Sequence, residues 1–299
     1  MTDPKWANVV YHDWESVTYD DKWSISFDER CIAYASDRFA AIAGRHGWPY
    51  GTALELGCGT GFFLLNLKQA GILDEGHVTD ISPGMVKAAQ RNAEQLGFTI
   101  DGRVADAERI PYDDDTFDLV LGHAVLHHLP DVEQAIREVV RVLKPGGRFV
   151  FAGEPTTIGD FYARRLGRLT WRATTRVTGL PMLRDRWARS QQELADQSEA
   201  AALEWVVDLH TFDPGELART CLRAGAVEVG TSTEELVAAL FGWPVRTFEA
   251  AVNPDRLGLG WATFAYRAWQ ALSAVDSKVL ARVLPRELFY NVLVTGLAP

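Results

Sequence analysis

The chain between residues 51 and 154 alternates short apolar runs with segments of helical periodicity, which is the pattern of βαβ units that build a parallel sheet. The apolar runs predict strands over residues 52–56, 76–80, 99–104, 117–122 and 147–153. The periodic segments between them predict helices over residues 60–71, 83–97 and 131–142. We therefore expect this part of the chain to form one α/β core.

The alternation stops after residue 154 and returns near the C-terminus. Thr211-Phe212-Asp213-Pro214 can cap a helix that runs to about Arg223, and residues 227–231 follow as a strand. Residues 288–297 mix β-branched, aromatic and apolar side chains, which predicts a final buried strand. Together these segments predict a seven-stranded, mostly parallel, Rossmann-like sheet with helices on both faces.

Two stretches, 155–210 and 233–285, are left over and are expected to form helical cap insertions. On a helix over residues 161–180, one face would carry the apolar side chains of Tyr162, Leu166, Leu169, Ala173, Val177 and Leu180. The opposite face would carry Arg164, Arg165, Arg168, Arg172 and Arg176. The second stretch has an apolar stripe at three- and four-residue spacing, made of Trp261, Phe264, Ala265, Ala268, Leu272 and Val275.

The formal net charge of −10 works against a nucleic-acid binder, because neutralising phosphates needs a basic surface. Polar residues interrupt the most apolar stretch, Leu257–Val275, so no transmembrane span is expected. The N-terminus lacks the regions of a signal peptide, so the expected location is the cytoplasm. Cys31, Cys58 and Cys221 are far apart and have no metal-ligand spacing, so we expect neither a disulfide nor a metal site.

The segment Leu54-Glu55-Leu56-Gly57-Cys58-Gly59-Thr60-Gly61 ends a predicted strand and opens a helix. Its glycines permit a tight turn and a close approach of a ligand to the backbone. The spacing is G-x-G-x-G rather than G-x-G-x-x-G, and the carboxylate of Glu55 would oppose a phosphate at the entrance of the loop. These two features disfavour a dinucleotide as the ligand.

The loop E-L-G-C-G-T-G resembles the first motif of class I S-adenosylmethionine-dependent methyltransferases, and further motifs of that family follow in order up to residue 154. The resemblance implies S-adenosyl-L-methionine as the cofactor and S-adenosyl-L-homocysteine as the product. Asp80 matches the acid that binds the ribose hydroxyls in this family, and Asp106 and Ala107 match its adenine site. A carboxylate suits the first role because it can accept hydrogen bonds from two vicinal hydroxyls.

The resemblance implies a cofactor site made of Tyr19, Glu55, Gly57, Cys58, Gly59, Gly61, Asp80, Ile81, Asp106, Ala107 and His123. For Glu55 two interpretations stay open: it reaches the methionine amine through backbone or water, or it restrains the loop. His12 and Tyr19 lie in an N-terminal segment that often covers the pocket in this family.

The domain organisation expected from these patterns is an N-terminal helical segment over the active site, the cofactor-binding core, a cap insertion, a core helix and strand, a second insertion and a final core strand. In the same order, these six parts are expected to comprise residues 1–50, 51–154, 155–210, 211–232, 233–285 and 286–299.

Methyl transfer in this family is an in-line displacement at a sulfonium methyl, which needs positioning of the acceptor and sometimes a general base. The candidates for catalysis are His123, at the expected end of the fourth strand, His127 of Leu126-His127-His128-Leu129, and Glu154. Each has a structural alternative: backbone shape or cofactor contact for His123, helix start and packing for His127, and structural hydrogen bonding for Glu154.

The expected function is methyl transfer to a hydrophobic small molecule, on oxygen before nitrogen or carbon, and the alternative is a non-catalytic cofactor-binding regulator. The fourth strand lacks the Asn/Asp-Pro-Pro-aromatic motif of enzymes that methylate base amino groups. Residues 161–189 hold eight arginines and a single acid, Asp185. This segment could contact an anionic membrane surface or substrate, or form a solvated face paired with acids between Glu193 and Glu204.

Overall fold

The computed structural model describes the chain except for residues 1–3, 17–18, 21–24, 46 and 196–205. The chain forms two compact units. The core unit comprises Met1–Glu154, Val206–Ser232 and Leu293–Pro299, and the helical unit comprises Pro155–Trp205 and Thr233–Val292. The domain boundaries expected from the sequence stay a prediction.

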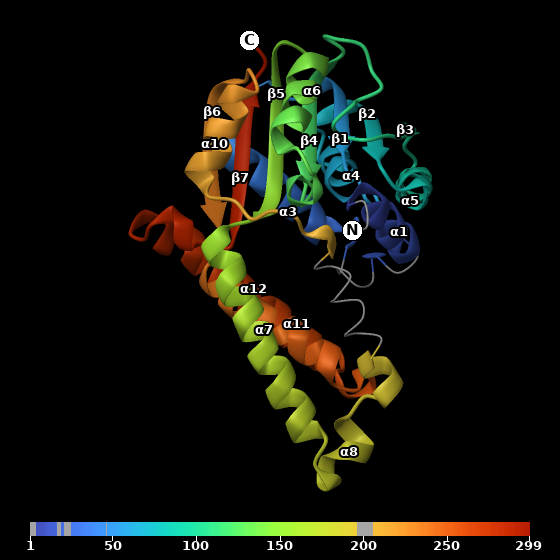
Figure 1. The fold of residues 1–299 in the computed structure, drawn as a ribbon, viewed down its shortest axis with the longest axis vertical. Coiled ribbons are helices and arrows are strands. Elements are labelled where there is room, and N and C mark those ends of the chain that lie inside the picture. Colours follow the sequence, from blue (N-terminus) through green and yellow to red (C-terminus); the bar gives the residue numbers. More distant parts are fainter. Residues whose placement is uncertain (1–3, 17–18, 21–24, 46, 196–205) are drawn as a thin grey trace. The chain divides into compact units, whose positions relative to one another are not determined.

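The core unit is built on a sheet with the strand order β3-β2-β1-β4-β5-β7-β6 (Figure 1). The strands are β1 Tyr50–Leu56, β2 Leu73–Asp80, β3 Ile100–Val104, β4 Phe117–His123, β5 Leu143–Pro155, β6 Val227–Glu234 and β7 Asn291–Leu297. Four neighbouring pairs, β3 with β2, β2 with β1, β1 with β4 and β4 with β5, are parallel. The predicted seven-stranded Rossmann-like α/β fold is confirmed.

Several strand ends differ from the prediction. β2 begins at Leu73 because its first residues continue the parallel ladder along β1, where Tyr50 pairs with Leu73. β7 begins at Asn291 rather than residue 288, because Pro285 precedes a short 3₁₀ helix over Arg286–Leu288. Boundaries of this kind depend on which backbone groups pair, and the apolar pattern does not encode them.

The helices of the core unit are α1 Pro4–Glu15, α3 Glu29–Ala43, α4 Phe62–Gln69, α5 Pro83–Gln95, α6 Val132–Val142 and α10 Pro214–Arg223. Four of them begin with side-chain caps, and the cap of α10 lies in residues 211–214, where the sequence predicted it. The Oγ of Ser82 accepts from the Met85 N–H, and the carboxylates of Asp131 and Asp213 cap α6 and α10 in the same way. In Figure 1, α6 and α10 lie side by side in front of the sheet, and α3 crosses behind it.

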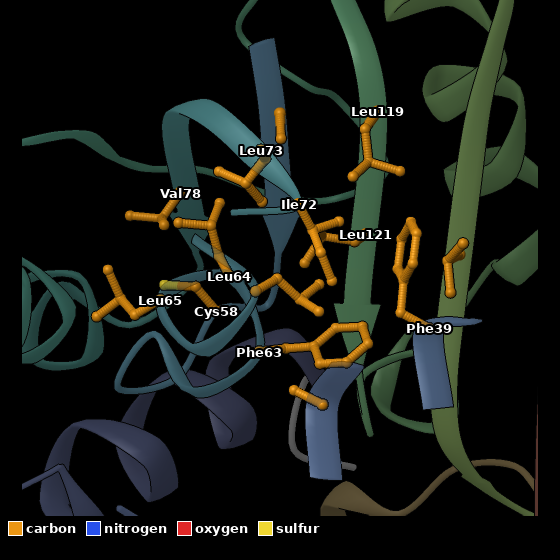
Figure 2. Close-up of a cluster of buried hydrophobic side chains, with 14 of the residues drawn as sticks. Phe39, Cys58, Phe63, Leu64, Leu65, Ile72, Leu73, Val78, Leu119 and Leu121 are labelled. Atoms are coloured by element: carbon orange, nitrogen blue, oxygen red, sulfur yellow. The ribbon is translucent and has the colours of Figure 1, made fainter. Parts of the chain in front are cut away.

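The main core cluster lies between the sheet and the helices behind it (Figure 2). Phe39 of α3 and Phe63 and Leu64 of α4 are fully buried against β1, β2 and β4. Burying a side chain of this size stabilises the fold by about 1.5–3 kcal/mol. This packing fixes α4, and therefore the glycine loop that precedes it, on the sheet.

The helical unit consists of α7 Thr157–Thr178, α8 Pro181–Trp187, α11 Val237–Ala251 and α12 Leu259–Lys278, with short turns between them. α7 packs on α11, and α11 packs on α12. Asp276 of α12 is buried and accepts from three backbone N–H groups at the start of α11, each at 2.9 Å. No helix among the described residues is both long and apolar enough to cross a membrane.

The prediction of which side of α7 is apolar and buried is wrong. Its packed side carries small residues, including the buried Ala163 and Gly167, whose missing side chain leaves room for Thr247 of α11. Leu169 and Leu180, which belong to the predicted apolar face, are exposed. Small residues allow two helix backbones to approach closely. A contact made of small residues does not appear in a pattern of large apolar side chains.

The predicted apolar stripe of α12 is only partly covered. Trp261 packs against Phe248 of α11 and donates a hydrogen bond to Glu249, but Phe264 and Val275 are exposed. Two members of the stripe therefore lie on the surface rather than in the core.

Candidate functional site

The carboxyl ends of the first four parallel strands meet at one edge of the sheet, and hydrogen bonds between their loops lock them together. The Cys58 N–H donates to the Thr79 carbonyl at 3.0 Å, and the Ala105 N–H donates to the Asp80 carbonyl at 2.9 Å. Ligands of open α/β sheets bind at this edge.

A pocket that is partly open to solvent lies at this edge of the sheet. Its lining comes from α1, the N-terminal segment, the glycine loop and the ends of β2, β3 and β4. The lining residues are Lys5, Asn8, His12, Tyr19, Ile25, Glu55, Gly57, Cys58, Gly59, Thr60, Phe62, Thr79, Asp80, Ile81, Ala105, Asp106, Ala107, His123, Ala124, Val125, His128, Leu129 and Pro130.

The glycine loop is shaped for close contact. Gly57 has a φ of +56°, and a Cβ built there would lie 2.2 Å from Cγ2 of Val125. Ala124, in the facing loop, also has a positive φ of 54°. Non-glycine residues in this conformation are uncommon and often mark functional sites. The missing side chain at Gly57 therefore leaves room for Val125 of the facing loop, and Gly57, Ala124 and Val125 all line the pocket.

Asp80 uses both carboxylate oxygens, one toward the glycine loop and the other toward the start of α5. Oδ2 accepts from the Gly59 N–H at 2.9 Å, and Oδ1 accepts from the Ser82 N–H at 2.8 Å. Burial raises the pKa of Asp80 to about 6, and these two backbone donors offset part of that effect. A carboxylate has about four lone-pair positions, so it can accept further hydrogen bonds from a ligand in the pocket.

Asp106 forms an ion pair with the ammonium group of Lys5. Its Oδ2 lies 2.6 Å from Nζ of Lys5 in α1, and Nζ also contacts Glu108 at 2.5 Å. Its Oδ1 accepts from the Glu108 N–H at 3.0 Å. A ligand amine at Oδ2 would therefore have to share or displace the Lys5 ammonium group.

Glu55 lies under the loop, with its carboxylate at the start of α4. Oε2 accepts from the Leu64 N–H at 3.1 Å. Burial raises the pKa of Glu55 to about 8. The Leu64 and Phe63 N–H groups stabilise the charged form and so offset part of that rise. This geometry supports the loop-restraining interpretation, while the side chain also lines the pocket.

The raised pKa of Glu55 gives a stability prediction with a definite sign. Between about pH 4.5 and 8 the folded protein keeps the Glu55 proton that the unfolded chain releases. The contribution of the protonated Glu55 to stability is therefore fully present below about pH 4.5. It is lost as the pH rises through about 8. Glu55→Gln does not titrate, so its free energy of unfolding should rise relative to wild type between pH 5 and about pH 9.

Chemical denaturation of both proteins across this pH range measures the difference. Glu94→Gln, at an exposed position of α5, is the matched control and should run parallel to wild type. Parallel curves for Glu55→Gln would contradict a raised pKa.

His123 ends β4 and enters the pocket between aromatic rings. The ring centroids of Phe62 and Phe63 lie 5.3 and 5.5 Å from that of His123, and Oη of Tyr34 lies 3.5 Å from Nε2. A Cβ at position 153 would come within 2.9 Å of the imidazole, so Gly153 leaves room for it. Burial lowers the pKa of His123 to about 4, which keeps the ring neutral near pH 7.

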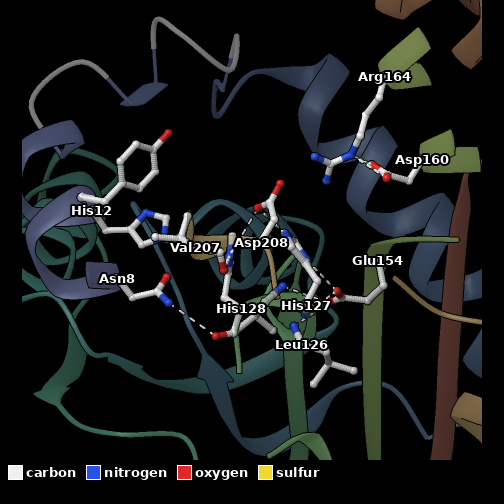
Figure 3. A network of polar contacts seen from close by, with 12 residues as sticks. Asn8, His12, Leu126, His127, His128, Glu154, Asp160, Arg164, Val207 and Asp208 are labelled. Carbon is white, nitrogen blue, oxygen red and sulfur yellow. Dashed lines mark hydrogen bonds and ion pairs between the residues drawn. The ribbon is translucent and has the colours of Figure 1, made fainter. Parts of the chain in front are cut away.

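Glu154 organises the backbone and side chain of the segment that carries Leu126 and His127 (Figure 3). Its fully buried carboxylate accepts from the N–H groups of Val125 and Leu126 at 2.8 and 2.9 Å, at the start of the 3₁₀ helix η1 Leu126–His128. It also contacts Nδ1 of His127 at 2.8 Å. Glu154 therefore fixes both the backbone of η1 and the orientation of the His127 ring.

One group of described side chains could hold a metal ion, although the sequence predicted none. One ligand atom from each of His127, His128 and Asp208 lies within 4.8 Å of the others. The N–H groups of Leu209 and His210 donate to the His127 carbonyl, which holds the Asp208 segment beside η1. Asp208 is distant in sequence, and no spacing rule connects it to the histidines.

Most of the residues named from the sequence lie together. Ten of them line the pocket: Tyr19, Glu55, Gly57, Cys58, Gly59, Asp80, Ile81, Asp106, Ala107 and His123. Gly61 instead precedes α4, with a φ of 85°. Glu154 and His127 form the network beside the pocket wall. What each residue binds or catalyses stays a prediction.

Sequence reasoning missed part of the lining. Lys5 and Asn8 come from α1, and Phe62 opens α4. The sequence predicted an N-terminal helical segment over the active site, with His12 and Tyr19 named in it, but nothing in the pattern singled out Lys5 and Asn8. Phe62 follows the glycine motif directly, so its place at the loop was available as a signal.

Comparison with known proteins gives a family for the central segment. Residues 54–151 match a family model described as "Methyltransferase domain". The chain is 41% identical over 100 residues to norajmaline N-methyltransferase of Rauvolfia serpentina, an overlap of 32% of this chain and 34% of that protein. It is 36% identical over 112 residues to 27-O-demethylrifamycin SV methyltransferase of Amycolatopsis mediterranei, covering 36% and 38% of the two chains. The chain thus spans about a third of the length of these relatives.

The fold is also found in solved structures. Phosphoethanolamine N-methyltransferase 2 of Haemonchus contortus, in complex with phosphomonomethylethanolamine and S-adenosylhomocysteine, superposes with a TM-score of 0.51 at 14% identity. The superposition covers 88% of this chain and 52% of the other. At this identity the likeness concerns the fold alone. The domain match, the strand order and the glycine loop at the sheet edge lead to one conclusion: residues 54–151 form a methyltransferase domain of the class I S-adenosylmethionine-dependent family.

Proposed function

We propose that the protein transfers a methyl group from S-adenosyl-L-methionine to a hydrophobic small molecule, with oxygen as the favoured acceptor atom. The observation that carries the proposal is the pocket at the sheet edge, where the glycine loop, Asp80 and His123 face one space. Apolar side chains from Ile25 and Phe62 line the same space, which suits an apolar acceptor.

The residues of the pocket fit the cofactor. Asp80 would accept from the ribose hydroxyls with lone pairs that Gly59 and Ser82 do not use. Asp106 and Ala107 would bind adenine, and the bare backbone at Gly57 would let the ligand approach closely. When bound, the cofactor supplies an electrophilic methyl group on a sulfonium centre.

The chain's own residues would position the acceptor and handle its proton. His123 is neutral, so one ring nitrogen can accept a hydrogen bond from an acceptor hydroxyl. While the acceptor oxygen takes the methyl group that the bound cofactor would supply, this nitrogen would accept the hydroxyl proton and release it to solvent, with S-adenosyl-L-homocysteine as the second product. His127, fixed by Glu154, would hold the adjacent wall in place for the same alignment.

Turnover tests the proposal. The protein is incubated with methyl-labelled S-adenosyl-L-methionine and apolar alcohols, phenols, amines and carbon acids, and label in the organic phase is counted. We expect label in a hydroxyl-bearing acceptor, with equimolar S-adenosyl-L-homocysteine. Transfer only to amines or carbon acids would overturn the choice of oxygen. Tight cofactor binding without turnover across the panel would favour a non-catalytic regulator.

A further inference from the structure

We propose that the exposed face of α7 and the turn after it form a binding surface for membranes that contain anionic phospholipid. We call this surface the arginine face, and it consists of Phe161, Arg165, Arg168, Leu169, Arg172, Arg176, Leu180 and Met182. It lies entirely within the helical unit. The proposal is independent of methyl transfer.

The charge of this segment differs in sign from that of the chain. Residues 161–189 hold eight arginines and one acid, Asp185, while the chain has a formal net charge of −10. The positive charge is therefore concentrated rather than scattered, and it creates a local attraction for anions.

The arginines point away from the packed side of α7. Ala163 and Gly167 lie on the side that meets α11. Positions 165, 168, 172 and 176 follow at spacings of three and four, which places them together on the opposite side of the helix. All four of these side chains are exposed.

Carboxylates in the described part of the chain do not form ion pairs with the arginines of this face. Asp160 pairs with Arg164, and Glu193 pairs with Arg189 at 3.5 Å, but both of these arginines lie beside the arginine face rather than on it. Among the described residues, no ion pair involves the four arginines at positions 165, 168, 172 and 176. The acids that the sequence suggested as partners lie partly in residues 196–204, outside the described part of the chain.

The arginines also form a shallow hollow, lined by Arg165, Arg168, Leu169 and Arg172. The guanidinium carbon of Arg165 lies 4.1 Å from the ring centroid of Phe161, which holds that side chain along the helix. Several guanidinium groups around one hollow can bind the phosphate of a lipid head group with charge-assisted hydrogen bonds.

Exposed apolar side chains beside the arginines identify the partner as a membrane. Phe161, Leu169 and Met182 are 57%, 63% and 91% exposed. A helix with arginines on one side and large apolar groups next to them is the pattern of interfacial helices, which insert the apolar groups between head groups. A free anion would leave these apolar groups in water, and the backbone of a nucleic acid offers them nothing to contact.

Vesicle co-sedimentation tests the proposal on the full chain. We expect wild type to bind vesicles of phosphatidylcholine with about 30% phosphatidylglycerol at least tenfold more tightly than pure phosphatidylcholine, and to be released at about 0.5 M NaCl. Each basic residue near an anionic surface contributes about 1 kcal/mol, so Arg168→Gln with Arg172→Gln should weaken binding by about tenfold or more.

Matched variants separate this surface from net charge. Arg91→Gln with Arg219→Gln, at exposed positions of α5 and α10 in the core unit, removes the same two charges and should leave vesicle binding unchanged. Met182→Ser, at a fully exposed site, should weaken binding without affecting the fold. Equal binding to both vesicle types, or equal loss in the two double variants, would overturn the proposal. So would complete release by about 10 mM inorganic phosphate at constant ionic strength, which would indicate a site for free oxyanions.

Discussion

Replacing Asp80 with alanine should lower the affinity for S-adenosyl-L-methionine by at least a hundredfold while leaving the protein folded. The change removes both proposed bonds to the ribose hydroxyls, and a hydrogen bond to a charged group contributes about 1.5–3 kcal/mol. It also leaves the N–H groups of Gly59 and Ser82 without the acceptor that shapes the loop. Because the ligand contact and the loop support are lost together, this is the largest binding effect we expect.

Isothermal titration calorimetry with S-adenosyl-L-methionine and S-adenosyl-L-homocysteine measures the loss. Asp101→Ala, on β3 and outside the pocket lining, is the control and should bind as wild type does. Asp80→Asn keeps one oxygen acceptor and should fall between the two. Affinity within tenfold of wild type in folded Asp80→Ala would argue against the assigned ribose contact.

Replacing Gly57 with alanine should destabilise the core unit by about 2–5 kcal/mol. The left-handed backbone costs a residue with a Cβ about 1–2 kcal/mol, and overpacking a filled site costs about 1–3 kcal/mol more. The first cost follows from the φ of +56°, and the second from the 2.2 Å approach to Cγ2 of Val125. The same Cβ would deform the loop that faces the pocket.

A double-mutant cycle separates the two costs. Gly71 has a φ of +69°, and a Cβ built there has no atom within 4 Å. The substitution Gly71→Ala therefore measures the backbone cost alone. Val125→Ala removes the obstructing methyl groups and should recover much of the loss in the double variant with Gly57→Ala. Equal destabilisation by Gly57→Ala and Gly71→Ala, measured by urea denaturation, would refute the steric argument.

The sheet and the loop could be predicted because their determinants are local. Buried parallel strands appear as continuous apolar runs, and a helix cap such as Asp213 stands directly before the helix that it begins. The glycine loop follows its strand directly, so the sequence alone places Gly57 and Gly59 at the pocket. In each case a few consecutive residues carry the whole signal.

The remaining features depend on contacts between distant segments. Asp208 meets His127 only because the segment before α10 returns to η1. The face that α7 buries was predicted wrongly because Ala163 and Gly167 make the seam, and periodicity scores large apolar residues above small ones. The roles of His123 and Glu154 were left with alternatives, since a sequence does not say which neighbours a buried side chain meets.

The contact between Lys5 and Asp106 has a thermodynamic consequence for the N-terminal helix. If adenine takes Oδ2 of Asp106, cofactor binding and the docking of α1 through Lys5 compete for one oxygen atom. Linkage between the two equilibria is reciprocal. The factor by which the docked Lys5 weakens cofactor binding therefore equals the factor by which bound cofactor weakens the docking of α1. Through this contact, saturation with cofactor would loosen the helix, and an antibody fragment that clamps α1 in place would act as an antagonist without entering the pocket.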